Sequence, residues 1–202
     1  MINIDFRVVS EFENEIANFF GAKYAIAVDS CTHGIELCLR YVGAKYISSP
    51  KQTYISVPFL SNKLGINLIW TDEKWQDWYV VWQNDSLKII DSAVLWKKNS
   101  YLSGTYMCLS FQYQKHLSLG RGGMILCDDE KSALELKKMS YDGRLPNIPW
   151  RDQDINIFGY HYYMTPETAK LGLEKLQKAI ETEPRKWLVN DWPDLTKMKI
   201  FK

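Results

Sequence analysis

Apolar residues recur at helical spacing close to the start of the chain. The pattern predicts a first helix that begins with Ser10 and Glu13, which stand three residues apart as in a capping box. Gly21 favours the end of this helix, because glycine adopts the left-handed conformation there at little cost. The buried face would consist of Phe12, Ile16, Phe19 and Phe20.

Short apolar runs bounded by turn residues follow along the chain. They predict strands at residues 24–28, 53–57, 66–71, 78–82, 87–91, 105–111 and 123–127. Helices are expected after residue 32, ending at Gly43, then at 129–139, and from Thr165-Pro166 onward. The last helix would bury Ala169, Gly172, Leu173, Leu176 and Ile180. Strands alternating with helices predict an α/β domain with a mostly parallel sheet, in which ligands bind beyond the carboxyl ends of the strands.

The chain changes character after Glu183-Pro184, where it becomes polar and contains tryptophan. We therefore expect one domain at residues 1–182 and a C-terminal arm at residues 183–202, rather than a second domain. The 202 residues are enough to bury one sizeable core.

Charge and hydropathy argue against several classes of protein. The 25 basic and 24 acidic residues give a net charge of +1 without a basic stripe, which disfavours binding to nucleic acid or to an anionic membrane surface. No apolar run approaches the ~20 residues of a membrane helix, and the first residues lack the order of a signal peptide. We therefore expect a cytoplasmic protein.

Cysteine and histidine are spaced too widely for a metal site. The cysteines at positions 31, 38, 108 and 127 form no C-x-x-C pair, so we expect reduced thiols and no structural zinc. His33, His116 and His161 stand far apart, and none has ligand spacing with a carboxylate. We expect no metal, and a hydrolase is disfavoured because no G-x-S-x-G motif is found.

A polar turn follows the predicted strand 24–28 and opens the next helix. It contains Ser30, Cys31 and Thr32, and its backbone N–H groups and hydroxyls could bind a phosphate at the positive end of the helix dipole. Simple N-capping by a hydroxyl is the alternative, and it is the commoner role of such turns.

Three further residues near strand ends could carry chemistry. Asp91 closes an apolar strand, where it could cap a helix, join a buried ion pair, or keep a pyridine nitrogen protonated. Lys115 follows strand 105–111 and precedes a glycine-rich turn; burial could lower its pKa for Schiff-base formation, or it could be an ordinary exposed lysine. Tyr54 could stack on a planar ligand or simply be packed.

The order of these segments resembles that of the DegT-type sugar aminotransferases, which are fold type I pyridoxal phosphate (PLP) enzymes. The most specific match is Ser110-Phe111-x-x-x-Lys115 followed by Gly120-x-Gly122-Gly123, which is similar to the family's S-F-x-x-x-K…G-x-G-G motif. The other matches, between about residue 19 and about residue 176, are the strand 20–28, the turn 30–34, Thr53-Tyr54, Asp91-Ser92-Ala93 and the segment 159–164.

The resemblance implies a fold and a set of roles. The domain would be the three-layer large domain of a fold type I aminotransferase. Lys115 would form the Schiff base to PLP and move protons, Asp91 would pair with the pyridinium nitrogen, and Tyr54 would stack on the ring. His161 would contact the cofactor phosphate of a neighbouring subunit. The phosphate within the subunit would be held by Ser30, Cys31, Thr32 and Ser110.

The chain departs from the family pattern at several of these positions. Cys31 and His33 replace small residues of the phosphate turn, and Val94 stands where Gln or His is usual. His161 and Tyr163 occupy the family's Asn and Arg positions. The segment between residues 81 and 89 is too short for the usual helical crossover, so either a tight turn joins two strands or one strand is lost. Most of the family's C-terminal small domain has no counterpart in the chain.

The resemblance implies a PLP-dependent aminotransferase that acts on a keto sugar, nucleotide-linked, with glutamate as amino donor, as a homodimer with shared active sites. A PLP-dependent sugar dehydratase is one alternative, but such relatives replace the lysine with histidine, whereas Lys115 is retained here beside His116. A non-catalytic or regulatory PLP-fold protein is the other alternative, which the missing domain and the changes at Val94 and Tyr163 favour.

Overall fold

The computed structural model describes residues 5–202. Its helices are α1 (Arg7–Phe20), α2 (Cys31–Tyr41), α3 (Ser56–Leu64), α4 (Glu130–Ser140) and α5 (Pro166–Glu181). Its strands are β1 (Tyr24–Val28), β2 (Tyr46–Pro50), β3 (Asn67–Thr71), β4 (Tyr79–Gln83), β5 (Lys88–Asp91), β6 (Thr105–Ser110) and β7 (Gly123–Cys127). Short 3-10 turns lie at η1 (Trp150–Asp152), η2 (Val189–Asp191), η3 (Leu195–Lys197) and η4 (Lys199–Phe201).

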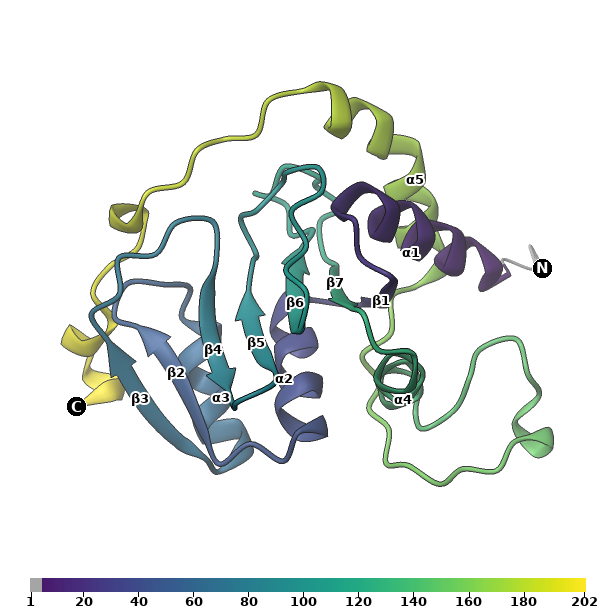
Figure 1. Cartoon of the computed structure of the whole chain (residues 1–202), viewed down its shortest axis with the longest axis horizontal. Coiled ribbons are helices and arrows are strands. Elements are labelled where there is room, and N and C mark those ends of the chain that lie inside the picture. Colours follow the sequence, from purple (N-terminus) through teal and green to yellow (C-terminus); the bar gives the residue numbers. More distant parts are fainter. Residues whose placement is uncertain (1–4) are drawn as a thin grey trace.

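The strands form a five-stranded sheet in the order β1-β7-β6-β5-β4 and a two-stranded parallel sheet of β2 and β3 (Figure 1). β7 runs antiparallel to both β1 and β6, and β5 pairs parallel with β6. β1, β5 and β6 therefore share one direction. The α/β class is confirmed, but the pairing is more mixed than expected, because β4 also runs antiparallel to β5.

A tight turn joins β4 to β5 and explains this reversal. The Asn84 N–H donates to the Leu87 carbonyl at 3.0 Å, and the Asn84 Oδ1 accepts from the Leu87 N–H at 2.8 Å. So few residues cannot form the crossover that a parallel connection needs. Of the two possibilities that the sequence left open, the structure shows two strands and a hairpin.

The sheet is covered on both faces, which gives three layers (Figure 1). Successive side chains of a strand point to opposite faces, so Ile125 and Cys127 of β7 join the core that includes α2, α3 and α4. Met124 and Leu126 of the same strand join the core formed with α1 and α5. The expected three-layer arrangement is thus present.

Two predictions about these elements were wrong, namely the start of the first helix and one of the strands. α1 begins at Arg7, ahead of Ser10, and Glu13 is buried instead of capping the helix. The Glu13 Oε1 accepts a hydrogen bond from the Ala27 N–H at 2.8 Å, and the carboxylate pairs with Lys137. A local capping pattern was therefore overruled by a tertiary contact.

The second wrong element is the strand predicted at 53–57. α3 begins at Ser56, and the strand of this region is β2, which ends at Pro50. The β-branched run suggested a strand, but Val57 and Leu60 are buried together at helical spacing, and Pro58 is tolerated because it lies in the first turn.

α5 begins as predicted. The Thr165 Oγ1 accepts from the Thr168 N–H, and Pro166 occupies the first turn. Gly172 lets α1 approach closely, because a Cβ there would lie 2.6 Å from the ring of Phe12. Ile180 is 41% exposed rather than buried, and Ala179 faces the core in its place.

The C-terminal arm, residues 183–202, crosses the molecule and ends beside β2 and β3 (Figure 1). The Leu195 N–H donates to the Lys51 carbonyl at 2.8 Å, and Gln52 forms an isolated β-bridge with Asp194. The Leu195 side chain is 1% exposed. The arm thus packs against the body of the domain. Within residues 5–202, no helix has the length and apolar character to cross a bilayer.

Candidate active site

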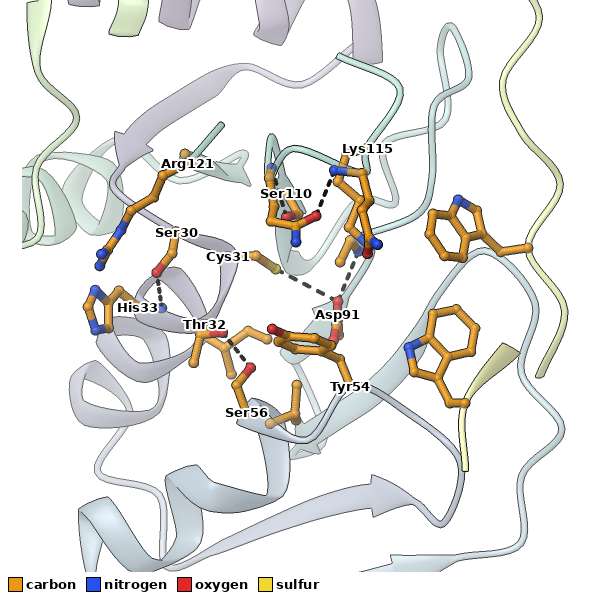
Figure 2. A pocket seen from close by; sticks show the side chains of 18 residues that line it. Ser30, Cys31, Thr32, His33, Tyr54, Ser56, Asp91, Ser110, Lys115 and Arg121 are labelled. Atoms are coloured by element: carbon orange, nitrogen blue, oxygen red, sulfur yellow. Dashed lines mark hydrogen bonds between the residues drawn. The ribbon is translucent and has the colours of Figure 1, made fainter. Parts of the chain in front are cut away.

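A cavity of about 360 Å³ opens where β5 and β6 end and α2 begins. This is the edge at which ligands are expected in such sheets. The predicted site residues that line it are Ser30, Cys31, Thr32, Tyr54, Asp91, Ser110 and Lys115, and Figure 2 shows them gathered around one space. His161 is not among the lining residues.

The N-terminus of α2 forms one side of the cavity. The Ser30 Oγ accepts from the His33 N–H at 3.2 Å, so the N-capping reading of this turn is confirmed. Capping does not use all of the first N–H groups of a helix, so the turn can still receive an anion. A Cβ on Gly123 would lie 2.4 Å from the Cys31 nitrogen, so only glycine lets β7 run against the turn.

Hydroxyls and charged groups surround this turn. The Thr32 Oγ1 lies 2.7 Å from the Ser56 Oγ. Asp29, which precedes the turn, pairs with Arg121 Nη2 at 2.8 Å and with His33 Nδ1 at 2.6 Å. The carboxylate is therefore engaged by its own partners and does not point unpaired at an incoming anion.

Asp91 lies at the centre of the cavity wall and is only 6% exposed. Its Oδ2 accepts from the Tyr79 hydroxyl at 2.7 Å, and its Oδ1 accepts from the Ala93 N–H at 2.9 Å and from the Cys31 thiol at 3.7 Å. Burial raises the pKa of the Asp91 carboxyl, and the hydrogen bond from Tyr79 is the largest opposing effect. These three donors carry no charge, so they do not neutralise the Asp91 carboxylate. Its negative charge can therefore pair with a ligand.

Lys115 lies in the loop that follows β6. Burial lowers the pKa of its ammonium, and the negative charge of Asp91 is the largest opposing effect. Its Nζ lies 4.6 Å from the centre of the Trp187 ring, which belongs to the C-terminal arm. The reading of Lys115 as an ordinary exposed lysine is thus wrong.

Tyr54 is 55% exposed, and it lines the same cavity as Asp91 (Figure 2). It is therefore not simply packed. The adjacent Thr53 is 2% exposed, and its Oγ1 lies 2.8 Å from the Tyr79 hydroxyl.

The Cys31 side chain points away from the phosphate turn. Its thiol lies 3.7 Å from the Asp91 carboxylate and 3.5 Å from the Cys108 carbonyl. The ring of His33 stacks on Tyr162 with ring centres 3.7 Å apart. Neither of these larger residues occupies the space in front of the helix N-terminus.

Sequence reasoning missed several residues of the cavity. Trp187 and Trp192 come from the arm, and nothing in the local pattern connects them with strand ends. Tyr79 does not line the cavity, but it contacts Asp91 from behind the wall, because the hairpin of β4 and β5 pairs the two residues. Arg121 lies inside the glycine-rich motif, so its position between two glycines could have singled it out.

His161 lies away from the cavity. Its side chain is 73% exposed, and its Nδ1 lies 3.1 Å from an Asp142 oxygen. Within residues 5–202, no group of three or more Cys, His, Asp or Glu side chains is arranged to hold a metal ion.

The three-layer α/β domain holds a partly buried lysine and a buried carboxylate in one cavity at the strand ends. Its fold is shared with the sugar aminotransferase CalS13 from Micromonospora echinospora, with a TM-score of 0.71 at 14% identity, over 86% of this chain and 61% of that one. The family model for the DegT/DnrJ/EryC1/StrS aminotransferase family matches residues 4–83 and 97–189. The chain belongs to this family, whose cofactor is PLP.

Known proteins are similar to this chain over most of its length. It is 25% identical to the spore coat polysaccharide biosynthesis protein SpsC of Bacillus subtilis, over 88% of this chain and 58% of that protein. It is 24% identical to GDP-perosamine synthase of Caulobacter vibrioides, over 87% of this chain and 58% of that protein. The structure of Helicobacter pylori PseC, an aminotransferase involved in pseudoaminic acid biosynthesis, matches with a TM-score of 0.70 at 14% identity, over 86% of this chain and 58% of that one. The chain spans just under three-fifths of these relatives.

Proposed function

We propose that this protein is a PLP-dependent aminotransferase that acts on a nucleotide-linked keto sugar, with glutamate as amino donor. The observation that carries the proposal is that Lys115 and Asp91, together with the hydroxyls at the start of α2, line one cavity. The alternative of a sugar dehydratase loses support, because the lysine is retained and lies in the cavity.

The residues present fit the cofactor. The helix N-terminus with Ser30 and Thr32 suits a phosphate, and Gly123 lets β7 pack closely against the backbone of this turn. Asp91 supplies a buried carboxylate for a ring nitrogen, and Lys115 supplies an amine whose pKa is lowered by burial. The volume of the cavity is in the usual range of ~300–1,000 Å³ for small-molecule sites.

Each residue would have a defined task. PLP, when bound, supplies a ring that withdraws electrons from the reacting carbon. Lys115 would hold the cofactor through its Nζ and carry a proton to and from the substrate carbon. Asp91 would keep the proton on the ring nitrogen, and Tyr54 would cover one face of the ring and exclude water. Ser30, Thr32 and Ser110 would fix the phosphate.

The names of the relatives support the sugar substrate. GDP-perosamine synthase and the polysaccharide protein SpsC are similar over most of this chain. Because this chain spans just under three-fifths of their length, the sugar itself and the glutamate donor rest on this likeness and not on the cavity.

We also propose a cytoplasmic homodimer in which each subunit completes the other's site. His161 is exposed and points away from its own cavity, and the preceding loop exposes the large apolar side chains of Trp150 and Phe158, at 69% and 90%. Exposed aromatic groups of this size are typical of interfaces. A monomer in light scattering at working concentration would contradict this arrangement.

Glutamate-dependent transfer tests the enzyme directly. Protein loaded with PLP is mixed with L-glutamate, and the release of 2-oxoglutarate is measured for wild type and Lys115→Ala. We expect release by the wild type and at least a hundredfold loss in the variant, because general acid–base catalysis alone contributes about 10²–10⁴-fold. Lys131→Ala, at an exposed position of α4, is the matched control and should behave as wild type.

The outcomes separate the alternatives. Binding of PLP without release of 2-oxoglutarate would contradict the aminotransferase with glutamate as donor and leave the non-catalytic PLP-fold protein. Failure to bind PLP at all would contradict both.

A further inference from the structure

Asp91 does not stand alone in the wall of the cavity but ends a chain of hydrogen bonds. Tyr79 is 1% exposed, and its hydroxyl donates to the Asp91 Oδ2 at 2.7 Å. The Thr53 Oγ1 lies 2.8 Å from the same Tyr79 oxygen. Because the tyrosine gives its only proton to the carboxylate, the threonine must be the donor in the second bond. Both protons therefore point toward Asp91.

The hairpin of β4 and β5 creates this contact. Tyr79 is paired with Asp91 in the antiparallel register, so the two side chains lie on the same face of the sheet. A β4 strand that ran parallel to β5 after a helical crossover would not place its first residue opposite the last residue of β5. The contact thus follows from the short turn at residues 84–87.

We propose that Tyr79, supported by Thr53, is a positioning residue that keeps Asp91 ionised so that the carboxylate can hold a proton on the nitrogen of a pyridine-type cofactor ring. This inference rests on the proposed binding of PLP. It gives the hairpin of β4 and β5 a role in the chemistry of the site. This hairpin lies outside both the motif around Lys115 and the phosphate turn.

The surroundings of Asp91 show why such support is needed. The carboxyl is buried, and burial raises its pKa, so its ionised form requires donors. The titratable groups around it are Tyr79 from β4, Cys31 from α2, Cys108 from β6 and Lys115 from the following loop. The pKa values of Cys31, Cys108 and Tyr79 are raised well above their ordinary values, mainly by burial, so these groups stay protonated. Of the three, Tyr79 makes the shortest bond to Asp91.

The direction of the effect follows from the bond that is lost. Without the tyrosine hydroxyl, the Asp91 carboxylate is less stable and binds a proton more readily. The proton shared between the carboxyl and the ring nitrogen then shifts toward Asp91, and the ring nitrogen becomes neutral at a lower pH. A hydrogen bond to a charged group is worth enough to move this midpoint by about one pH unit.

The experiment uses ¹⁵N-labelled PLP bound to the purified protein, with the ring nitrogen resonance followed by NMR as a function of pH. Tyr79→Phe should lower the midpoint for loss of the nitrogen proton by about one pH unit relative to wild type. Thr53→Val should move it in the same direction by less, and Asp91→Asn should lower it the most, because the carboxylate itself is lost. Tyr106→Phe is the matched control, because that buried hydroxyl donates to Ser132 instead.

The possible results are distinguishable. A midpoint in Tyr79→Phe equal to that of wild type, with PLP bound in both, would overturn the role of Tyr79 and leave the proposed function intact. An equal shift in Tyr106→Phe would also overturn it, since the effect would then be a general loss of packing. Wild-type protein that fails to bind PLP would defeat the proposed function itself.

Discussion

At the scale of single residues, the cavity holds opposite charges where water is largely excluded. Burial raises the pKa of the Asp91 carboxyl and lowers the pKa of the Lys115 ammonium, because each charged form loses hydration. The attraction between the two groups opposes both shifts. The cofactor-free protein therefore carries an electrostatic cost at its site, which is the usual condition of a site prepared for a ligand.

Asp91→Asn tests this cost through the pH dependence of stability. The folded pKa of Asp91 is raised above the unfolded value of ~3.9, so the folded protein binds more protons in the window between them. The free energy of unfolding of the wild type then falls as pH rises through that window and is constant above it, as far as this group is concerned. Relative to wild type, cofactor-free Asp91→Asn should gain stability as pH rises from 4 to 7. Urea unfolding at both pH values measures the difference, and a gap that does not change with pH would contradict the expected burial cost.

The site residues that could be predicted from the sequence are those that a local sequence pattern singles out. Asp91 ends an apolar strand, Lys115 lies in the loop after another, and Ser30 caps a helix, so strand ends and helix starts point to them. Tyr79 and Trp187 could not be found in this way. One depends on the direction of a neighbouring strand, and the other lies in a segment whose path over the cavity is set by distant packing.

At the scale of elements, the C-terminal arm supplies one wall of the cavity. Trp187 and Trp192 stack with ring centres 5.4 Å apart, and Trp192 also lies 4.9 Å from Trp75. The Gln52 Nε2 donates to the Trp192 carbonyl at 3.1 Å. These contacts tie the arm to the loop that carries Tyr54, so both are placed together.

Leu195→Ala should release the arm without unfolding the domain. The side chain is 1% exposed, and the truncation removes the arm's buried anchor, whereas the sheet and its helices make their own cores. Cleavage by trypsin after Arg185 or Lys186 should become about tenfold faster, with the unfolding midpoint of the domain changed little. Ile200→Ala, at a position that is 70% exposed, is the control. Equal acceleration in the control, or loss of the whole fold in Leu195→Ala, would show that the arm is not anchored in this way.

The elements that sequence reasoning predicted correctly are those with one strong signal. β7 is apolar throughout and bounded by turns, and α5 carries Thr165 and Pro166 at its start. The region around residue 55 carried competing signals, since its β-branched residues suit a strand, and the helix was decided by the burial of Val57 and Leu60. The direction of β4 could not be predicted from local patterns, because the turn between β4 and β5 determines it.

At the scale of the whole molecule, three layers bring distant segments to one edge of the sheet. The start of α2, the ends of β5 and β6, the loop before α3 and the arm all reach the cavity (Figure 2). The chain spans just under three-fifths of the curated relatives that it matches, and these segments lie within that part. The residues proposed to hold the cofactor within one subunit therefore lie in the part of the relatives that this chain matches, and a second subunit is proposed to contribute His161.

Lys115 is proposed to be the amine that binds PLP. Protein incubated with PLP is treated with borohydride, which fixes a lysine-bound cofactor irreversibly, and the peptides are then mapped by mass spectrometry. We expect one dominant modified residue, Lys115, and no comparable label elsewhere in Lys115→Ala. Label spread over several exposed lysines, or an unlabelled Lys115, would contradict it.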